Sequence, residues 1–118
     1  MMAREFPQRG EIWTVLLPGL PKDLHQPRPG LVVSRNGQNR WEDSIIVVPL
    51  HSAGTADQVN ILIRRGTGGI ARDSVLSCAE VSCIEKEFLV SGPYGRPVPE
   101  ALLDEVTLGV RRAIGDVI

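Results

Sequence analysis

The sequence predicts a small, mainly β protein, in which a strongly bent antiparallel sheet or open barrel carries one C-terminal amphipathic helix. Two observations predict this fold. From residue 11 to residue 91, short apolar runs rich in β-branched residues alternate with clusters of Gly, Pro and polar residues, which is typical of strands joined by turns. After residue 99, apolar residues recur at helical spacing. The 118 residues contain no internal repeat and no long linker, so we expect residues 1–118 to form a single domain.

Each predicted strand is bounded by residues that favour turns. The first, EIWTVLL, follows Gly10 and ends before Pro18. The polar loop RNGQNRWED separates the second strand from the third and has room for a helical turn. The Gly-rich run RRGTGGIARD separates the fourth strand from the fifth, which is expected to be the longest. The predicted strands span residues 11–17, 31–34, 44–50, 59–63, 74–84 and 88–91.

The terminal helix is predicted from its periodicity and from both of its ends. Pro99 suits the first helical position, and Gly115 is expected to stop the helix. Glu100 near the start and Arg111 near the end complement the helix dipole. The apolar face comprises Leu102, Leu103, Val106, Val110, Ala113 and Ile114.

Composition and charge limit the function classes. The 13 basic and 14 acidic side chains give a net charge of −1, so binding to nucleic acid requires a local basic patch. No apolar stretch approaches the roughly 20 residues of a membrane span, and the N-terminal residues lack the apolar core of a signal peptide. We therefore expect a soluble, cytoplasmic protein without membrane contact. Cys78 and Cys83 are expected to be reduced thiols, neither a disulfide nor metal ligands.

The stretch QPRPGLVVSRN places Arg28 between two prolines at the foot of an apolar run. Pro29 disfavours the helical region for the residue before it, so Arg28 is held extended where the loop becomes a strand. An arginine held in this way suits a ligand such as phosphate, because its fork of donors needs little further ordering. The alternative is a surface arginine that happens to precede a turn.

Between Arg9 and Gly115, five segments of the chain resemble, in their order along the sequence, the MazF/PemK family of toxin ribonucleases. The segments are RGEIWTVLLP, RPGLVVSRN, IIVVPLHS, RDSVLSCAEVSCIEKEFL and PEALLDEVTLGVRRAIG. The resemblance implies an SH3-like barrel of about five to seven antiparallel strands with a C-terminal helix, similar also to CcdB toxins. It further implies a homodimer, cleavage of single-stranded RNA (mRNA, tRNA or rRNA) without metal or other cofactor, and an antitoxin partner that occupies the RNA groove.

The catalytic arginine of the family's R-P motif falls on Arg28. Cleavage of RNA without metal requires a base that takes the 2′-OH proton, a cation that stabilises the phosphorane, and an acid for the departing 5′ oxygen. The resemblance therefore implies that Arg28 acts at the scissile phosphate and that the products carry a 2′,3′-cyclic phosphate and a 5′-OH.

Two positions depart from the family pattern. Where the family has a threonine or serine in P-x-T-S, this chain has His51, and where the family has Q-V-R, it has Glu80 followed by Val81 and Ser82. One hypothesis is an acid-base pair of His51 and Glu80 across the cleft. A second is that both residues are solvated at the barrel rim. A third is a decayed site that binds RNA or a partner without cutting.

The remaining candidates are weaker. Ser52 is a candidate hydroxyl donor beside the lost threonine, or else a turn residue. The loop of residues 18–27 covers the RNA groove in the family, which makes Lys22, His25 and Gln26 candidate RNA ligands, although His25 equally suits an exposed loop without a role.

Another basic group follows the second predicted strand. Arg35, Asn36 and Arg40 are candidates for contacts with phosphates or stacking on bases, and Trp41 beside them is either a stacking platform or a loop anchor. The arginines that flank the Gly-rich run are expected to form a basic cluster or a solvated edge: Arg64, Arg65 and Arg72. No Gly-Lys-Ser/Thr follows the glycines, which argues against nucleotide binding.

The competing function is a binding protein of the same barrel fold. Such a protein would act on DNA gyrase, as the related CcdB toxins do, or would bind only an antitoxin. Cutting of RNA in EDTA, lost in Arg28→Ala, distinguishes the ribonuclease from this alternative.

Overall fold

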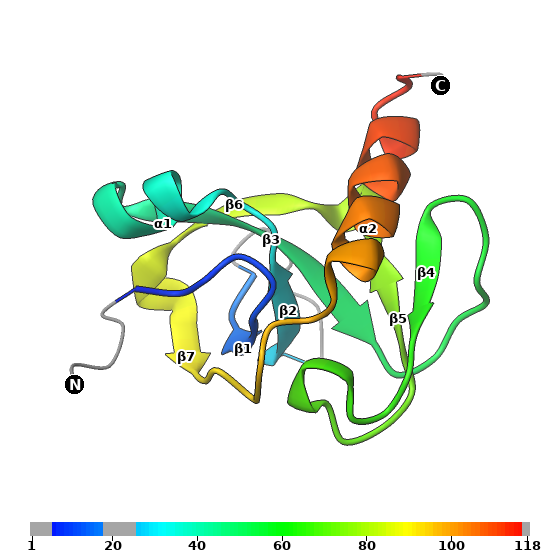
Figure 1. Cartoon of the computed structure of the whole chain (residues 1–118), viewed down its shortest axis with the longest axis horizontal. Helices are drawn as coiled ribbons and strands as arrows, with labels where there is room; N and C mark the ends of the chain where they lie inside the picture. The colour runs from blue at the N-terminus through cyan, green and yellow to red at the C-terminus, as the bar shows by residue number, and fades with distance from the viewer. Residues whose placement is uncertain (1–5, 18–25, 117–118) are drawn as a thin grey trace.

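The computed structural model describes residues 6–17 and 26–116. Seven strands form one antiparallel sheet in the order β4-β5-β3-β2-β1-β7, with β6 also paired to β3 (Figure 1). The sheet is bent but open, because β4 and β7 stand at its two ends. The elements are β1 (Ile12–Val15), β2 (Arg28–Val32), α1 (Asn36–Trp41), β3 (Ser44–His51), β4 (Asn60–Ile63), η1 (Thr67–Gly69), β5 (Ser74–Ser77), η2 (Cys78–Glu80), β6 (Ser82–Glu85), η3 (Lys86–Phe88), β7 (Leu89–Ser91) and α2 (Glu100–Ala113).

The mainly β, antiparallel fold with a terminal helix is confirmed, and most strands lie where the sequence predicts them. The second strand begins earlier than expected, at Arg28, which is therefore a strand residue rather than the end of a loop. The polar loop after it contains the short helix α1.

The prediction of one long strand over residues 74–84 is wrong. β5 ends at Ser77, the chain turns through the 3₁₀ helix η2, and β6 begins at Ser82. Both strands pair with the same edge of β3, since β6 lies beside its first half and β5 beside Leu50 and His51. The regular alternation that would have put Cys78, Glu80 and Ser82 on one face is therefore interrupted.

Packing against α2 explains this corner. Cys78 at the start of η2 is fully buried, and its thiol donates to the Val106 carbonyl of α2 across 3.8 Å. A Cβ atom on Gly109 would lie 2.7 Å from the Cys78 Sγ, so the helix approaches this closely only because Gly109 has no side chain. Burial raises the pKa of the Cys78 thiol to about 11. Both cysteines are free, and Cys83 is exposed.

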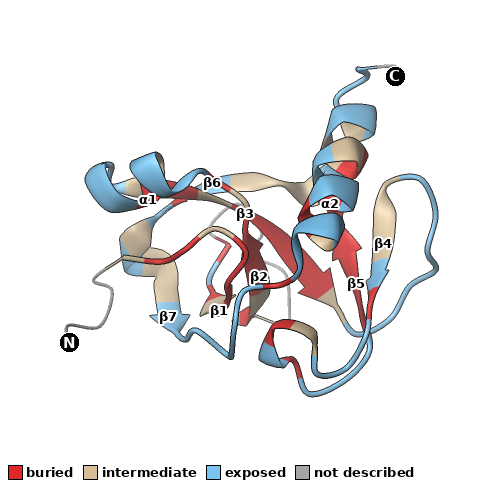
Figure 2. Ribbon diagram, viewed as in Figure 1, coloured by how far each residue is buried: buried red, intermediate tan, exposed pale blue. Residues whose placement is uncertain are grey.

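The central strands are covered on both faces (Figure 2). Successive residues of β2 belong to different apolar clusters: Leu31 to the cluster under α2, and Val32 to the cluster on the opposite face. The first cluster contains Ile12, Leu31, Val48, Leu50, Ile63, Ile70, Leu76, Cys78, Val98, Leu103 and Val106. The second contains Val15, Leu17, Val32, Ile45, Val47 and Ile84. Polar side chains that could contact a ligand therefore lie at the strand ends and in the loops.

The ends of α2 follow the expected signals, with one shift. Pro99 is the N-cap residue rather than the first helical residue. At the other end Gly115 has φ +85°, and the Asp116 and Gly115 amides donate to the carbonyls of Arg111 (2.8 Å) and Arg112 (3.1 Å). These two bonds form a Schellman motif, which satisfies carbonyls that the helix leaves unpaired. Among the elements of the described chain, no helix is both long and apolar enough to cross a membrane.

Candidate active site

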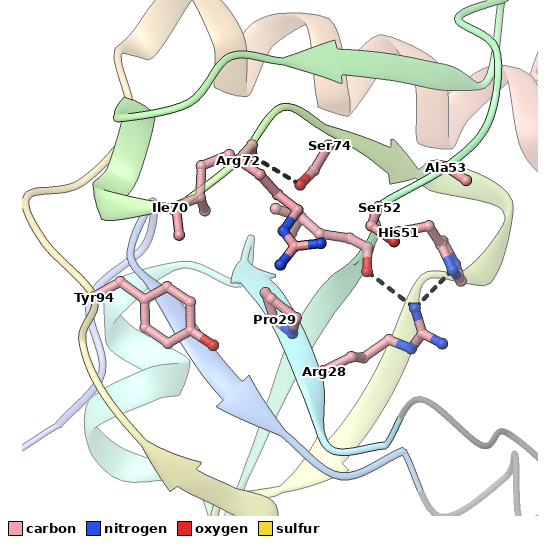
Figure 3. A pocket seen from close by; sticks show the side chains of 11 residues that line it. Arg28, Pro29, His51, Ser52, Ala53, Ile70, Arg72, Ser74 and Tyr94 are labelled. Atoms are coloured by element: carbon pink, nitrogen blue, oxygen red, sulfur yellow. Dashed lines mark hydrogen bonds between the residues drawn. The ribbon is translucent and has the colours of Figure 1, made fainter.

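A cavity of about 540 Å³ opens where several strand ends meet (Figure 3). Its walls come from the start of β2, the end of β3, the loop before β5 and the segment after β7. The lining residues are Arg28, Pro29, Leu50, His51, Ser52, Ala53, Ile70, Ala71, Arg72, Ser74 and Tyr94. Two arginines and a histidine thus share a hollow whose lining, among the described residues, includes no carboxylate.

Arg28 reaches this cavity through the register of two neighbouring strands. Gly30 of β2 pairs with Pro49 of β3, and two residues further along this antiparallel pair Arg28 comes opposite His51. Arg28 is only 6% exposed. Its Nη1 donates to the Leu50 carbonyl at 3.1 Å and contacts His51 Nδ1 at 2.7 Å. The guanidinium is therefore held rigidly at the cavity wall.

The contact with Arg28 determines the tautomer of His51. A guanidinium only donates hydrogen bonds, so the Nδ1 atom of His51 accepts and carries no proton in this arrangement. The neutral ring then carries its hydrogen on Nε2, which donates to the Glu80 Oε1 at 2.5 Å. Arg28, His51 and Glu80 form one continuous chain of hydrogen bonds.

Glu80 joins this chain because of the η2 corner. The corner residue Glu80 accepts through its backbone carbonyl a 2.8 Å hydrogen bond from the Ser82 hydroxyl, which fixes the turn into β6. The His51 and Glu80 side chains are 30% and 38% exposed, so the carboxylate end of the chain remains in contact with solvent. Solvent weakens this hydrogen bond between His51 and Glu80, but its geometry is well defined.

The other catalytic candidate also lies at the cavity. Ser52 follows His51 in the lining and is exposed. Its hydroxyl makes no hydrogen bond with any residue that the structure describes, and it is therefore available to a ligand.

Of the three candidates from the loop of residues 18–27, the structure describes only Gln26. Lys22 and His25 lie outside the described residues. The side-chain amide of Gln26 binds the backbone of Leu17, two residues after β1: its Oε1 accepts from the Leu17 amide at 2.6 Å, and its Nε2 donates to the Leu17 carbonyl at 3.0 Å. An RNA contact by any of the three stays a prediction.

Arg35, Asn36 and Arg40 do not line the cavity. Asn36 and Arg40 belong to α1, and Arg35 is its N-cap residue. The helix adjoins the start of β3 (Figure 1), whereas the cavity is lined by Leu50 and His51 at the end of that strand. The Asn36 Oδ1 accepts from the Arg9 amide at 2.7 Å. Arg40 stacks on the exposed ring of Trp41, 4.6 Å from its centroid. A role of these residues in binding RNA also stays a prediction.

Two cavity residues, Tyr94 and Arg72, were not predicted to lie at the site. Tyr94 lines the cavity and exchanges a 2.5 Å hydrogen bond with the Thr14 hydroxyl of β1, a contact across 80 residues that no local pattern reveals. Arg72 was grouped with Arg64 and Arg65, but of these three it alone lines the cavity. The available signal was its position just before a predicted strand, since Arg28 also precedes the strand predicted over residues 31–34.

Residues 6–17 and 26–116 contain no group of three or more His, Cys, Asp or Glu that could hold a metal ion. Metal independence of the chemistry stays a prediction, which a chelator tests.

Comparisons with known proteins agree with this fold. The family model described as "PemK-like, MazF-like toxin of type II toxin-antitoxin system" matches residues 8–114. Among solved structures, MazF from Deinococcus radiodurans is similar with a TM-score of 0.77 and 17% identity, over 95% of this chain and 99% of that chain. An endoribonuclease from a mycobacterial species has a TM-score of 0.70 and 19% identity, over 92% of this chain and 91% of that one. A mycobacterial endoribonuclease in complex with its cognate antitoxin has a TM-score of 0.75 and 17% identity, over 95% and 98%. A comparison with curated protein sequences found no match.

Proposed function

Because this chain belongs to the family of PemK-like, MazF-like toxins of type II toxin-antitoxin systems, we propose that it is a sequence-specific endoribonuclease that cuts single-stranded RNA. The observation that carries the proposal is the chain of hydrogen bonds from Arg28 through His51 to Glu80 at the wall of a cavity. The mycobacterial proteins of similar structure, which are endoribonucleases, support the same activity.

In the first step, an RNA phosphate competes for Arg28. Guanidinium and phosphate match in geometry and charge, so the Nη1 hydrogen bond passes from His51 Nδ1 to a phosphate oxygen. This exchange exposes the lone pair of Nδ1. His51 then accepts the proton of the adjacent 2′-OH, and the Nε2–H of the resulting imidazolium points at the Glu80 carboxylate.

In the second step, the 2′ oxygen attacks phosphorus and the bond from phosphorus to the 5′ oxygen breaks. Negative charge accumulates on the phosphorane oxygens, where the rigid Arg28 stabilises it without reorganising. The products are a 2′,3′-cyclic phosphate and a 5′-OH. The proton on His51 then passes to solvent.

The departing 5′ oxygen lies on the side of phosphorus opposite the 2′ oxygen, so a group other than His51 serves it. Ser52 lines the cavity with a hydroxyl that is available to a ligand. We assign to Ser52 a hydrogen bond to the departing oxygen, which takes its proton from water.

The partners follow from the family rather than from the site. The proposed substrate is single-stranded RNA, and the proposed inhibitor is a cognate antitoxin, as in the mycobacterial complex of similar structure. A homodimer in the cytoplasm is the proposed working form. These assignments rest on membership of the toxin family.

The test is incubation of the pure protein with a long single-stranded RNA in EDTA. We expect cuts at a few short sequences, and a loss of at least about 10²- to 10³-fold in Arg28→Ala, because one preorganised donor to a developing oxyanion contributes that much. Arg65→Ala removes the same charge from an exposed position outside the cavity and should cut at the wild-type rate.

Intact RNA at high protein concentration would contradict the ribonuclease proposal and would favour a barrel protein that binds gyrase or only an antitoxin. Circular dichroism of Arg28→Ala establishes that the variant is folded. Arg28→Lys adds a second check, since it keeps the charge and loses the fork.

A further inference from the structure

We propose that Arg72 binds a second phosphate of the RNA, next to the scissile phosphate held by Arg28. Arg72 would be a positioning residue, since it holds the strand rather than the reacting atoms. The inference rests on the proposed ribonuclease function and adds to it a second contact site for the same strand.

Arg72 is available for such a contact. Its side chain is exposed and lines the cavity, and it forms no ion pair with any residue in the described ranges. The neighbouring carboxylate of Asp73 is engaged elsewhere: it accepts from the Arg65 amide at 2.8 Å and lies 3.9 Å from the Arg64 guanidinium. Within the described part of the chain, the positive charge of Arg72 therefore faces the hollow without a paired carboxylate.

The loop that carries Arg72 is anchored. Ile70 is buried in the cluster under α2 with 5% exposure. Gly69 has φ +89°, and a Cβ atom there would lie 2.5 Å from the Tyr94 carbonyl oxygen, so the loop packs directly on the segment after β7. The Arg72 carbonyl accepts a 3.1 Å hydrogen bond from the Ser74 hydroxyl. The backbone of Arg72 thus has a defined place at the rim.

The spacing of the two arginines suits successive phosphates of one strand. Arg28 lies on β2 and Arg72 leads into β5, and β3 stands between these strands in the sheet. Two strand intervals correspond to about 10 Å between the backbones. Arg72 stands two residues before β5, and the length of both side chains allows them to hold two neighbouring charges; none of the described residues in the lining is a carboxylate that would repel these charges.

Phosphate is a better ligand for Arg72 than a base edge. Selective readout of a base needs a guanidinium fixed by its own hydrogen bonds, as Arg28 is, whereas a charge contact tolerates a side chain with freedom of movement. Pro29 lies between the two arginines, and Ile70 and the Tyr94 ring continue the apolar lining beyond Arg72, which suits the sugars and bases of the bound strand (Figure 3).

The experiment measures binding of a mixed-sequence RNA with 2′-fluoro groups throughout, which keeps the phosphates and lacks the attacking hydroxyl. The logarithm of the binding constant is followed against the logarithm of salt concentration for the wild type, Arg72→Ala, Arg72→Lys and Arg65→Ala. Loss of one phosphate contact should reduce the slope by about 0.7 in Arg72→Ala, while Arg72→Lys and Arg65→Ala keep the wild-type slope.

Cleavage kinetics supply an independent readout. Arg72→Ala should raise KM about 2- to 5-fold and leave kcat unchanged, because an exposed ion pair contributes this little and does so equally in substrate and transition state. An unchanged salt slope in Arg72→Ala, or an equal drop in Arg65→Ala, overturns the inference. If the wild type binds with an Arg72-dependent slope but never cuts, the ribonuclease proposal fails and the phosphate contact stands.

Discussion

Two polar networks lie at opposite ends of β3, and they differ in where their hydrogen bonds lead. At the α1 end, Asn39 is fully buried. Its Nδ2 donates to the Ser34 carbonyl at 2.9 Å, and its Oδ1 accepts from the Ser34 hydroxyl at 2.5 Å. The same hydroxyl accepts from the Ile46 amide at 3.0 Å. This network satisfies the backbone and its own members, as buried polar groups generally do.

At the other end, the chain of Arg28, His51 and Glu80 runs along a cavity wall. Arg28 is about as buried as Ser34, but its partner His51 is 30% exposed, and the cavity before them has room for a ligand. Burial of polar groups therefore does not by itself identify a functional site. The feature that marks it is an ordered cation and a proton acceptor that open onto a hollow.

Among the substitutions that distinguish the two networks, the largest loss of activity is expected at His51. His51→Ala removes the proposed base and should lower kcat/KM about 10²- to 10⁴-fold. The measurement is the pH profile of cleavage from about pH 5 to about pH 8, where histidine changes charge. A variant that cuts at the wild-type rate across this range would show that another group takes the proton.

His51→Asn separates the two roles of His51. The asparagine oxygen can occupy the place of Nδ1 and accept from Arg28, but it cannot take a proton. We expect this variant to be as inactive as His51→Ala. Retained activity would mean that His51 serves only to hold Arg28.

A smaller effect is expected at Glu80. Glu80→Gln keeps an oxygen that accepts from His51 Nε2 and removes the negative charge that stabilises the imidazolium. A hydrogen bond to a charged group contributes about 1.5–3 kcal/mol, so kcat should fall about 10- to 10²-fold. The 38% exposure of the carboxylate favours the lower end, since solvent screens it. A loss as large as that of His51→Ala would contradict this division of roles.

The smallest effect on activity is expected at the α1 end. Asn39→Ala leaves the Ser34 groups without their partner in a buried place and should lower the free energy of unfolding by about 1–3 kcal/mol. Denaturant unfolding measures this loss. The cleavage rate per folded molecule should not change, and a parallel loss of activity would mean that the two networks are coupled.

The sequence predicted the elements whose signals are local. Pro99 and Gly115 bound α2, and the spacing of Leu103 and Val106 identifies its buried face. The break between β5 and β6 was not predictable, because Cys78 and its neighbours continue an acceptable strand pattern. That corner depends on contact with Gly109, which is distant in the sequence.

The site likewise contains residues that a local sequence signal predicts and residues that no local signal predicts. The prolines around Arg28 are a local signal, and the family resemblance drew attention to His51 and Glu80 as departures at adjacent motifs. The cavity wall that carries Arg72 and Tyr94 is assembled by contacts of the Gly-rich loop with the segment after β7. Neither hydrophobic periodicity nor a sequence motif reveals such contacts between segments that are distant in the sequence.

We propose that this cavity directs the 2′-OH of RNA at the neighbouring phosphate. The most direct measurement is mass spectrometry of the RNA ends after cleavage in EDTA, with a matched strand that carries a 2′-deoxy sugar at the cut. We predict 2′,3′-cyclic phosphate and 5′-OH ends on the RNA and no cut at the deoxy position. Ends with 3′-OH and 5′-phosphate, or cutting of the 2′-deoxy strand, would contradict the account.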